Sequence, residues 1–133
     1  MASTYTTNLG IEKIGAGEQA GAWGTTTNNN FDLLDEAVNG VISISLSGTS
    51  KTLTTSSGTL SEGGRKVIIF TGSPGGDCTV TISPPEAEKM YFIDNQADQK
   101  LIMIQGTGGT VGNSRAVEIA ASSKGLIYAD GAG

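Results

Sequence analysis

The sequence contains no histidine and a single cysteine, Cys78, and this excludes several kinds of active site. A Ser-His-Asp or Cys-His arrangement needs an imidazole as its base, and a typical zinc site needs histidines or several cysteines. One cysteine cannot form a disulfide within the chain. Cys78 lies in a run of alternating polar and apolar residues, so it is expected to be a small core side chain. We therefore expect no catalytic residues, no metal, no cofactor and no enzymatic activity.

Basic residues are also scarce, since eight Lys and Arg against thirteen Asp and Glu give a formal net charge of −5. Binding to nucleic acids and to anionic membranes depends on Lys and Arg side chains. No apolar run approaches the ~20 residues of a membrane span. The first ten residues lack the basic and apolar regions of a signal peptide. We expect neither a nucleic acid nor a membrane as a partner.

Apolar residues are few as well, at 37% of the chain, while glycine supplies 20 of the 133 residues. Glycine loses much backbone entropy when it becomes ordered. A chain of this length forms one domain with a modest core. A small apolar surface on a flexible backbone favours stabilisation by neighbouring molecules, and oligomerisation is one way to obtain it.

The first region, residues 1–40, is expected to be an irregular, glycine-interrupted arm that ends in one short helix. Asn29 is a suitable N-cap, and Asp32 at the third helical position is similar to a capping box. Asn39-Gly40 supplies residue types that end helices in the left-handed conformation. The pattern thus predicts a helix of ~10–11 residues, which is too short to be stable alone in water.

The predicted helix has an apolar face that includes Phe31, Leu34 and Val38. Because a helix this short needs tertiary contacts, we expect that face to be covered. Trp23, the only tryptophan, lies just upstream between small residues. It is expected either to fold back onto the helix or to insert into a partner, where a large aromatic side chain makes an effective anchor.

The second region, residues 41–133, is predicted to consist of strands. Short segments alternate between apolar and polar residues, and turn-forming residues separate them. The predicted strands are 41–46, 51–55, 66–71, 78–82, 89–94, 101–105, 116–120 and 126–129. About eight short strands at this spacing indicate a mainly β fold with a β-sandwich or jelly-roll-like module. The uninterrupted apolar run at 67–70 predicts a central strand that is buried on both faces.

Two clusters that could carry chemistry are better explained as connections. Asp94, Asn95 and Asp98 offer oxygen ligands for calcium, but their spacing does not match an EF-hand loop and a turn is favoured. The glycine-rich segment 106–112 lacks the glycine and lysine positions of nucleotide-binding loops, so a flexible hairpin loop is favoured there.

Four segments of the first region occur in a recognisable order, and they are Leu9-Gly10-Ile11, Gly17-Glu18, Gly21-Ala22-Trp23-Gly24 and Asn30-Phe31-Asp32-Leu33-Leu34-Asp35. This pattern resembles a motif near the N-terminus of bacteriophage tail fibres and related virion proteins. Ile14 stands where that motif commonly has proline. The second region, through segments 65–71, 78–84, 90–95, 101–106 and 125–131, is similar to a β-module that often follows the motif.

This resemblance implies a structural component of the virion, assembled in the host bacterial cytoplasm. It implies an N-terminal segment that attaches to other virion proteins of the tail or capsid, and a homo-oligomer, with a homotrimer expected. The candidate docking residues are Trp23, Gly24, Asn30, Phe31 and Leu34.

Two other functions are compatible with the sequence. The first alternative is a capsid decoration (cement) protein, which differs from a tail fibre in its position on the particle. The second alternative is a module that binds a host surface glycan, for which Trp23 and Tyr128 are the candidate aromatic side chains.

Overall fold

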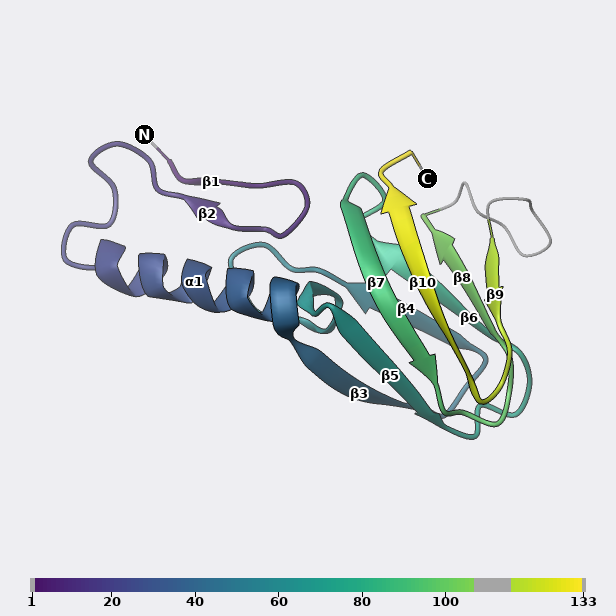
Figure 1. Ribbon diagram of the computed structural model, residues 1–133. Coiled ribbons are helices and arrows are strands. Elements are labelled where there is room, and N and C mark those ends of the chain that lie inside the picture. The colour runs from purple at the N-terminus through teal and green to yellow at the C-terminus, as the bar shows by residue number, and fades with distance from the viewer. Residues whose placement is uncertain (1, 107–115, 133) are drawn as a thin grey trace.

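The computed structural model describes residues 2–106 and 116–132, and it confirms the prediction of a mainly β chain (Figure 1). One α-helix, α1 (Trp23–Asn39), and one short 3-10 helix, η1 (Glu62–Gly64), accompany the strands in this part of the chain. The strands are β1 (Thr4–Tyr5), β2 (Glu12–Lys13), β3 (Val41–Leu46), β4 (Ser50–Thr54), β5 (Val67–Gly72), β6 (Cys78–Ser83), β7 (Glu88–Asn95), β8 (Leu101–Gln105), β9 (Val117–Ile119) and β10 (Ser123–Asp130).

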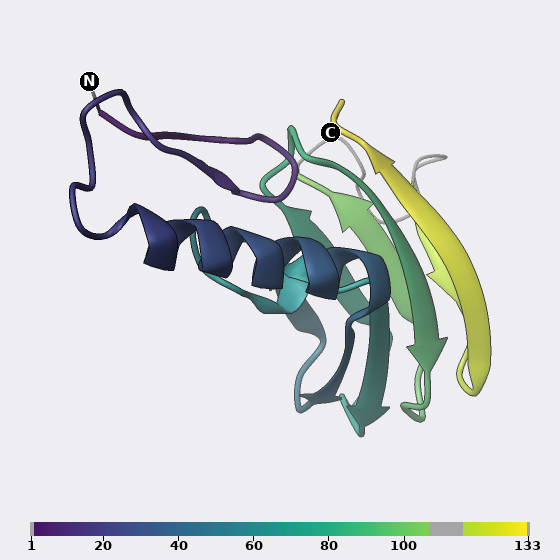
Figure 2. The same ribbon diagram turned by 60° about the vertical axis from the view of Figure 1, so that its left-hand side comes forward.

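The eight strands β3 to β10 form two four-stranded sheets. The first sheet has the order β10-β7-β5-β3 and the second has the order β4-β6-β8-β9. In each sheet three strands are parallel, and the last strand, β10 or β9, is antiparallel to its neighbour. The chain passes from one sheet to the other after β3, β4, β5, β6 and β7, so successive strand pairs stack as layers with the same direction (Figures 1 and 2).

This topology does not confirm a jelly roll, which is built from antiparallel Greek-key strands. The predicted strand positions agree with the structure, and 41–46 and 101–105 match β3 and β8. The pairing differs because, from β3 to β8, each new strand lies beside the previous strand of its own sheet and runs in the same direction. Periodicity of two identifies the inward side of a strand, but it does not identify the strand's neighbours.

The hydrophobic core lies between the two sheets and is built from the inward residues of both. Fully burying an aliphatic or aromatic side chain contributes about 1.5–3 kcal/mol. Cys78 is buried in this core as predicted. The completely covered apolar side chains are Leu53, Ile68, Phe70, Cys78, Val80, Ala87 and Leu101.

The prediction that residues 67–70 are buried on both faces is only half right. β5 is an interior strand, and Ile68 and Phe70 are fully buried. Val67 and Ile69 point to the other side and are half-buried. No element in the described residues packs over that outer face of the sheet, so its apolar side chains stay accessible.

The helix is longer than predicted and begins at Trp23, with Ala22 rather than Asn29 as its N-cap. Asn29 lies inside α1, where its side-chain amide donates a hydrogen bond to the Gly58 carbonyl oxygen at 2.8 Å. The N-cap prediction is wrong because this tertiary contact satisfies Asn29 within the helix, so the residue does not need a terminal position.

Gly40 does end the helix, but not in the left-handed conformation that we predicted. Its φ is −68° and its ψ is 143°, which is extended backbone. A side chain there would come within 2.8 Å of the Glu36 Cα atom, so glycine is required for a close approach and not for a positive φ.

The segment before the helix folds back along it instead of extending as an arm (Figure 1). The short strands β1 and β2 form a two-stranded hairpin. The Gly10 carbonyl oxygen accepts a hydrogen bond from the Gly58 N–H at 2.6 Å, and the Asn8 side chain accepts one from the Glu88 N–H at 2.8 Å. These bonds tie the hairpin to the strand-bearing part of the chain, so the irregular arm is not confirmed.

Candidate docking surfaces

Four large apolar side chains form an uncovered stripe on α1, which we call the helix stripe. It consists of Trp23, Phe31, Leu34 and Val38, which are 61%, 61%, 41% and 64% exposed. Their spacing of eight, three and four residues places them on one side of the helix. Leu33, on a different side, is 3% exposed and holds the helix against the rest of the chain. The apolar face predicted to be covered is therefore open.

The remaining two predicted docking residues differ from this stripe. Gly24 lies in the first turn, and a side chain there would meet nothing within 4 Å. Asn30 accepts a hydrogen bond from the Glu12 N–H at 3.0 Å and donates one to the Glu12 carbonyl oxygen at 2.9 Å. Asn30 thus positions the hairpin against α1 and has a structural role within the chain. Docking by these residues stays a prediction.

The outer face of the β10-β7-β5-β3 sheet is also apolar. One residue from each strand forms a row across the full width of the sheet, because Val41 pairs with Val67, Val67 with Phe92, and Phe92 with Leu126. Large exposed apolar patches are uncommon on monomeric proteins and mark interaction sites. We call this surface, together with Tyr128, which is 75% exposed, the apolar face.

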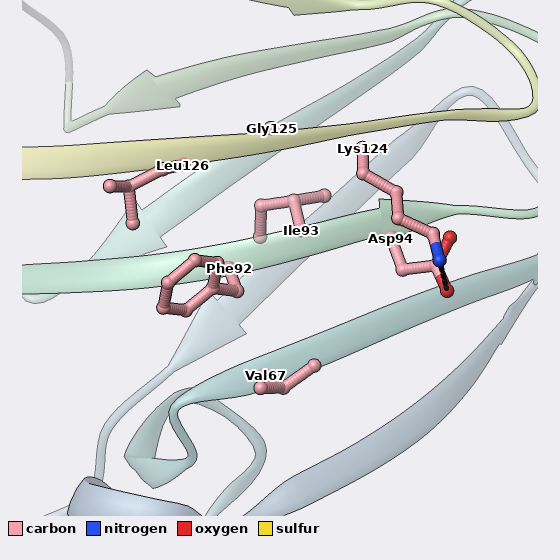
Figure 3. Close-up of a pocket in the computed structure, with 7 residues that line it drawn as sticks. All are labelled: Val67, Phe92, Ile93, Asp94, Lys124, Gly125 and Leu126. Atoms are coloured by element: carbon pink, nitrogen blue, oxygen red, sulfur yellow. Dashed lines mark ion pairs between the residues drawn. The ribbon is translucent and has the colours of Figure 1, made fainter.

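A hollow of about 450 Å³ lies on the apolar face (Figure 3). Phe92 and Leu126 line one side of it, and Val67 lies below them. Asp94 and Lys124 lie at the other end, where the Lys124 Nζ atom is 3.9 Å from a carboxylate oxygen of Asp94. The hollow therefore combines apolar side chains with one charge of each sign.

The outer face of the second sheet is polar over its first two strands, β4 and β6. In register across β4 and β6, Thr52 pairs with Thr81, and Thr54 pairs with Ser83. Thr52 and Thr54 are exposed. Short hydroxyl side chains on a pleated surface suit contact with water. The outer faces of the two sheets thus differ in polarity, although both sheets pack on the same hydrophobic core.

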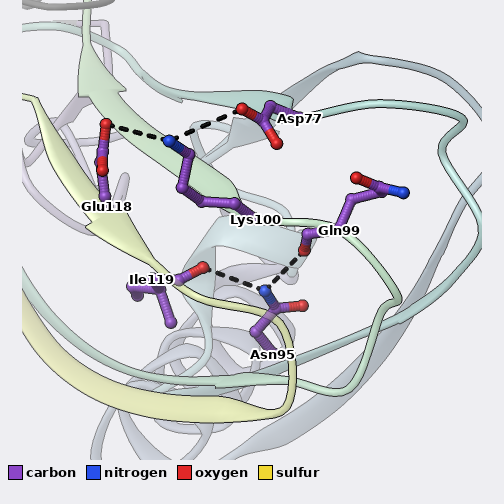
Figure 4. Close-up of polar contacts among 6 residues, drawn as sticks. All are labelled: Asp77, Asn95, Gln99, Lys100, Glu118 and Ile119. Carbon is purple, nitrogen blue, oxygen red and sulfur yellow. Dashed lines mark hydrogen bonds and ion pairs between the residues drawn. The ribbon is translucent and has the colours of Figure 1, made fainter.

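A buried asparagine joins the two sheets at one end of the molecule (Figure 4). Asn95, which is fully buried at the end of β7, donates from its amide nitrogen to the carbonyl oxygens of Gln99 at 2.9 Å, Ile119 at 3.1 Å and Ala120 at 3.1 Å. Its amide oxygen accepts from the Ala97 N–H at 3.0 Å. A buried amide with this many partners fixes the geometry of two connections.

An ion-pair group lies beside this asparagine. The Lys100 Nζ atom is 3.3 Å from a carboxylate oxygen of Glu118 and 3.6 Å from one of Asp77 (Figure 4). The hydrogen bond and charge of Glu118, followed by those of Asp77, raise the pKa of Lys100. Exposed ion pairs of this kind contribute little to stability. Asn95 is therefore expected to contribute more to the stability of this end of the molecule than the ion pairs do.

One lysine, Lys89, points inward at the other end of the molecule. Its Nζ atom donates to the Gly63 carbonyl oxygen at 3.2 Å, and the Tyr91 hydroxyl donates to the same oxygen at 2.7 Å. Desolvation lowers the pKa of Lys89 to about 8. Desolvation likewise raises the pKa of Tyr91 to about 12.

The structure accounts for the other residues that could have carried chemistry. Burial raises the pKa of the Cys78 thiol, which makes it less reactive. The predicted turn is correct for Asp98 alone, because Asp94 and Asn95 are the last residues of β7. The amide of Asn95 and the carboxylate of Asp94 already have protein partners. Within residues 2–106 and 116–132, no three His, Cys, Asp or Glu side chains are grouped to hold a metal ion. Most of the glycine-rich segment 106–112 lies outside the described residues.

In the same described ranges, no helix combines the length and hydrophobicity that are needed to cross a membrane. No known protein family, curated protein or solved structure matches this chain.

The apolar face was missed from the sequence, although a signal for it was present. Met90-Tyr91-Phe92-Ile93 and Leu126-Ile127-Tyr128 are continuous apolar runs in strands that alternate elsewhere. A strand with apolar residues on both sides presents them to the core and to the outer face. The sequence could not show that no other segment among residues 2–106 and 116–132 covers the outer side.

Proposed function

We propose that this chain is a structural component of a bacteriophage virion, of the tail-fibre type, that docks on the particle through its N-terminal region and assembles with copies of itself. The resemblance implies three copies in such an assembly. Residues 41–133 serve in this proposal as the stable β-body, and residues 1–40 serve as the attachment segment.

The observation that carries the proposal is the helix stripe. It lies in the segment with the tail-fibre resemblance, and Trp23, its largest side chain, stands in the first turn of α1 with most of its surface exposed. Tryptophan is enriched among the residues that dominate binding energy at protein interfaces. The stripe is held in place because Asn30 and Leu33 anchor other sides of the helix.

The proposal is tested by replacing Trp23 with alanine in the full chain. The tagged chain is produced in host cells infected with the virus that encodes it, and its amount in purified particles is measured. We expect Trp23→Ala to lower incorporation by about tenfold or more, as for an interface hot spot. Asn28→Ala, at an exposed polar position of the same helix, is the matched control and retains normal incorporation.

Two results would overturn the proposal. One is the complete absence of the wild-type chain from particles, and the other is full incorporation of the Trp23→Ala chain in a folded state. The position of the labelled chain on a particle map separates a tail fibre from a capsid decoration protein, which would dock through the same stripe.

The hollow on the apolar face supports a second candidate function, which is binding of a host surface glycan. Sugar rings stack on exposed aromatic side chains, and polar groups nearby fix their hydroxyls. Phe92 and Asp94 are arranged in this way, with Tyr128 on the same face. Trp23, the other aromatic candidate, lies on the helix instead. Glycan-array binding that is lost in Phe92→Ala would support this function, and an array without signal would exclude it.

A further inference from the structure

The edge strands of the two sheets differ in how well they are protected against pairing with another chain. Exposed edges are guarded in natural proteins by charges, short strands or inward-pointing charged residues. β10 carries Lys124 and Asp130, and β9 has three residues and contains Glu118. β4 carries Lys51, whose Nζ atom is 2.8 Å from a carboxylate oxygen of Glu62. Each of these three edge strands therefore carries a feature that opposes pairing with another chain.

The fourth edge strand, β3, has no such protection. Its sequence, Val-Ile-Ser-Ile-Ser-Leu, contains no charge and no proline over six residues. All six residues pair with β5, which is its single strand neighbour in the described part of the chain. In Figure 1, β3 lies at the outer edge of its sheet, and α1 leaves from the N-terminal end of the strand. An edge of this kind is a template for strand addition.

The hydrogen bond that begins the β3–β5 ladder shows which backbone groups are free. The Gly40 carbonyl oxygen accepts from the Val67 N–H at 2.9 Å, so the backbone groups of Gly40 point toward β5. Alternate residues of a strand point their backbone groups to the same side. The even-numbered residues of β3 thus face β5, and the odd-numbered residues face the open edge. The outward set is Val41, Ser43 and Ser45.

We infer that this edge pairs with β3 of a second copy of the chain, antiparallel, with Ser43 opposite the Ser43 of that copy. In this register each Val41 lies opposite a Ser45. All three outward N–H groups and all three outward C=O groups of each copy gain partners. On the inward side, Ile42 meets the Ile44 of the other copy, so apolar residues meet apolar residues.

The strand sequence favours a second copy over an unrelated strand. Any even shift keeps the apolar and serine positions of the two copies on matching faces, whereas a shift of one residue would mix them. The strand is thus complementary to itself. Ile42, which is only partly buried in the single chain, would also gain cover from the second copy. The resulting contact has two-fold symmetry and is isologous.

Sedimentation of the purified full chain with Ser43→Lys tests the inference. Two lysines would lie directly opposite each other across the contact, and like charges there oppose pairing. In place of the three copies that the tail-fibre resemblance implies, we expect the purified wild type to contain two copies at micromolar concentration. Ser43→Lys should raise the dissociation constant by about tenfold or more. Thr52→Lys, which places the same charge on an exposed site of β4, is the matched control and leaves the dimer intact.

Hydrogen exchange gives a second measurement that does not depend on a variant. The amides of Val41, Ser43 and Ser45 should become protected as the concentration of the wild type rises. A monomer, or a trimer whose mass and exchange are unchanged by Ser43→Lys, would overturn the pairing. Either result leaves Trp23-dependent incorporation into particles to be judged separately, since that experiment uses a different surface.

Discussion

The two sheets of this protein share one core but present opposite outer faces. The β10-β7-β5-β3 sheet exposes an apolar row that includes Phe92 and Leu126, while the β4-β6-β8-β9 sheet exposes hydroxyl side chains such as Thr52 and Thr54. The inward residues of both sheets are almost uniformly apolar and buried. This comparison shows that the inward-facing residues specify the fold, whereas the outward-facing residues are free to determine which molecules the protein binds.

Removing the side chain that joins the two sheets should have the largest effect on stability. In Asn95→Ala, the buried carbonyl oxygen of Ile119 and the partly buried one of Ala120 lose a donor, and an unsatisfied buried group costs about 1–3 kcal/mol. We expect the free energy of unfolding to fall by about 3 kcal/mol in urea denaturation. Gln96→Ala, at the exposed neighbouring position, should change it little. An equal effect of both variants would contradict the role of Asn95.

The second prediction concerns Lys89, at the border between the core and the outer faces. Because its pKa is about 8 in the folded chain and higher when unfolded, the unfolded chain binds more protons above pH 8. Stability should therefore rise from pH 8 to about 10, by about 2 kcal/mol at most. Above that, Tyr91 acts in the opposite direction, since its pKa is raised on folding.

Unfolding titrations of the wild type and Lys89→Met across this range measure the effect of the lysine. The unfolding free energy of the wild type minus that of Lys89→Met should rise by about 2 kcal/mol between pH 8 and 10 if Lys89 is the source. A difference that is constant with pH would show that the ammonium group is not desolvated by folding.

The smallest effect on stability is expected for changes on the outer faces. Phe92→Ser combined with Leu126→Ser should alter the unfolding free energy by about 1 kcal/mol or less, since both side chains are already half exposed. Binding of a hydrophobic dye should fall strongly. Thr52→Phe on the opposite face should raise dye binding instead. Dye binding that is insensitive to both changes would mean that the apolar face is not the accessible patch.

Much of the fold could be predicted from local patterns. Alternation in Ile42-Ser43-Ile44-Ser45-Leu46 located β3, and similar patterns located β4 to β10 to within a few residues, whereas β1 and β2 were not predicted. The buried position of Cys78 followed from the same alternation. Local patterns succeed here because the inward side of a strand is set by the geometry of two adjacent residues.

Apart from the conformation of Gly40, which a local contact with Glu36 explains, the failures concern contacts between residues that are far apart in the sequence. Asn29 was predicted to cap a helix, but its bond to Gly58 draws it into the helix interior. Within the described residues only Leu33, on another side of the helix, is covered, so cover of Phe31, Leu34 and Val38 by a partner stays a prediction. For the candidate sites, Trp23, Phe31 and Leu34 could be selected from the sequence, whereas the link between Asn30 and Glu12 could not.

The sequence by itself determined where the strands lie, which of their side chains enter the core, and which kinds of active site are excluded by the absence of histidine. The tertiary structure alone decided that the strands pair in parallel across two alternating sheets, that one outer face is an apolar surface, and that β3 has a free edge. The physical reason is that periodicity depends on neighbours along the chain. Strand pairing and exposure depend on which distant segments cover each backbone edge and each face.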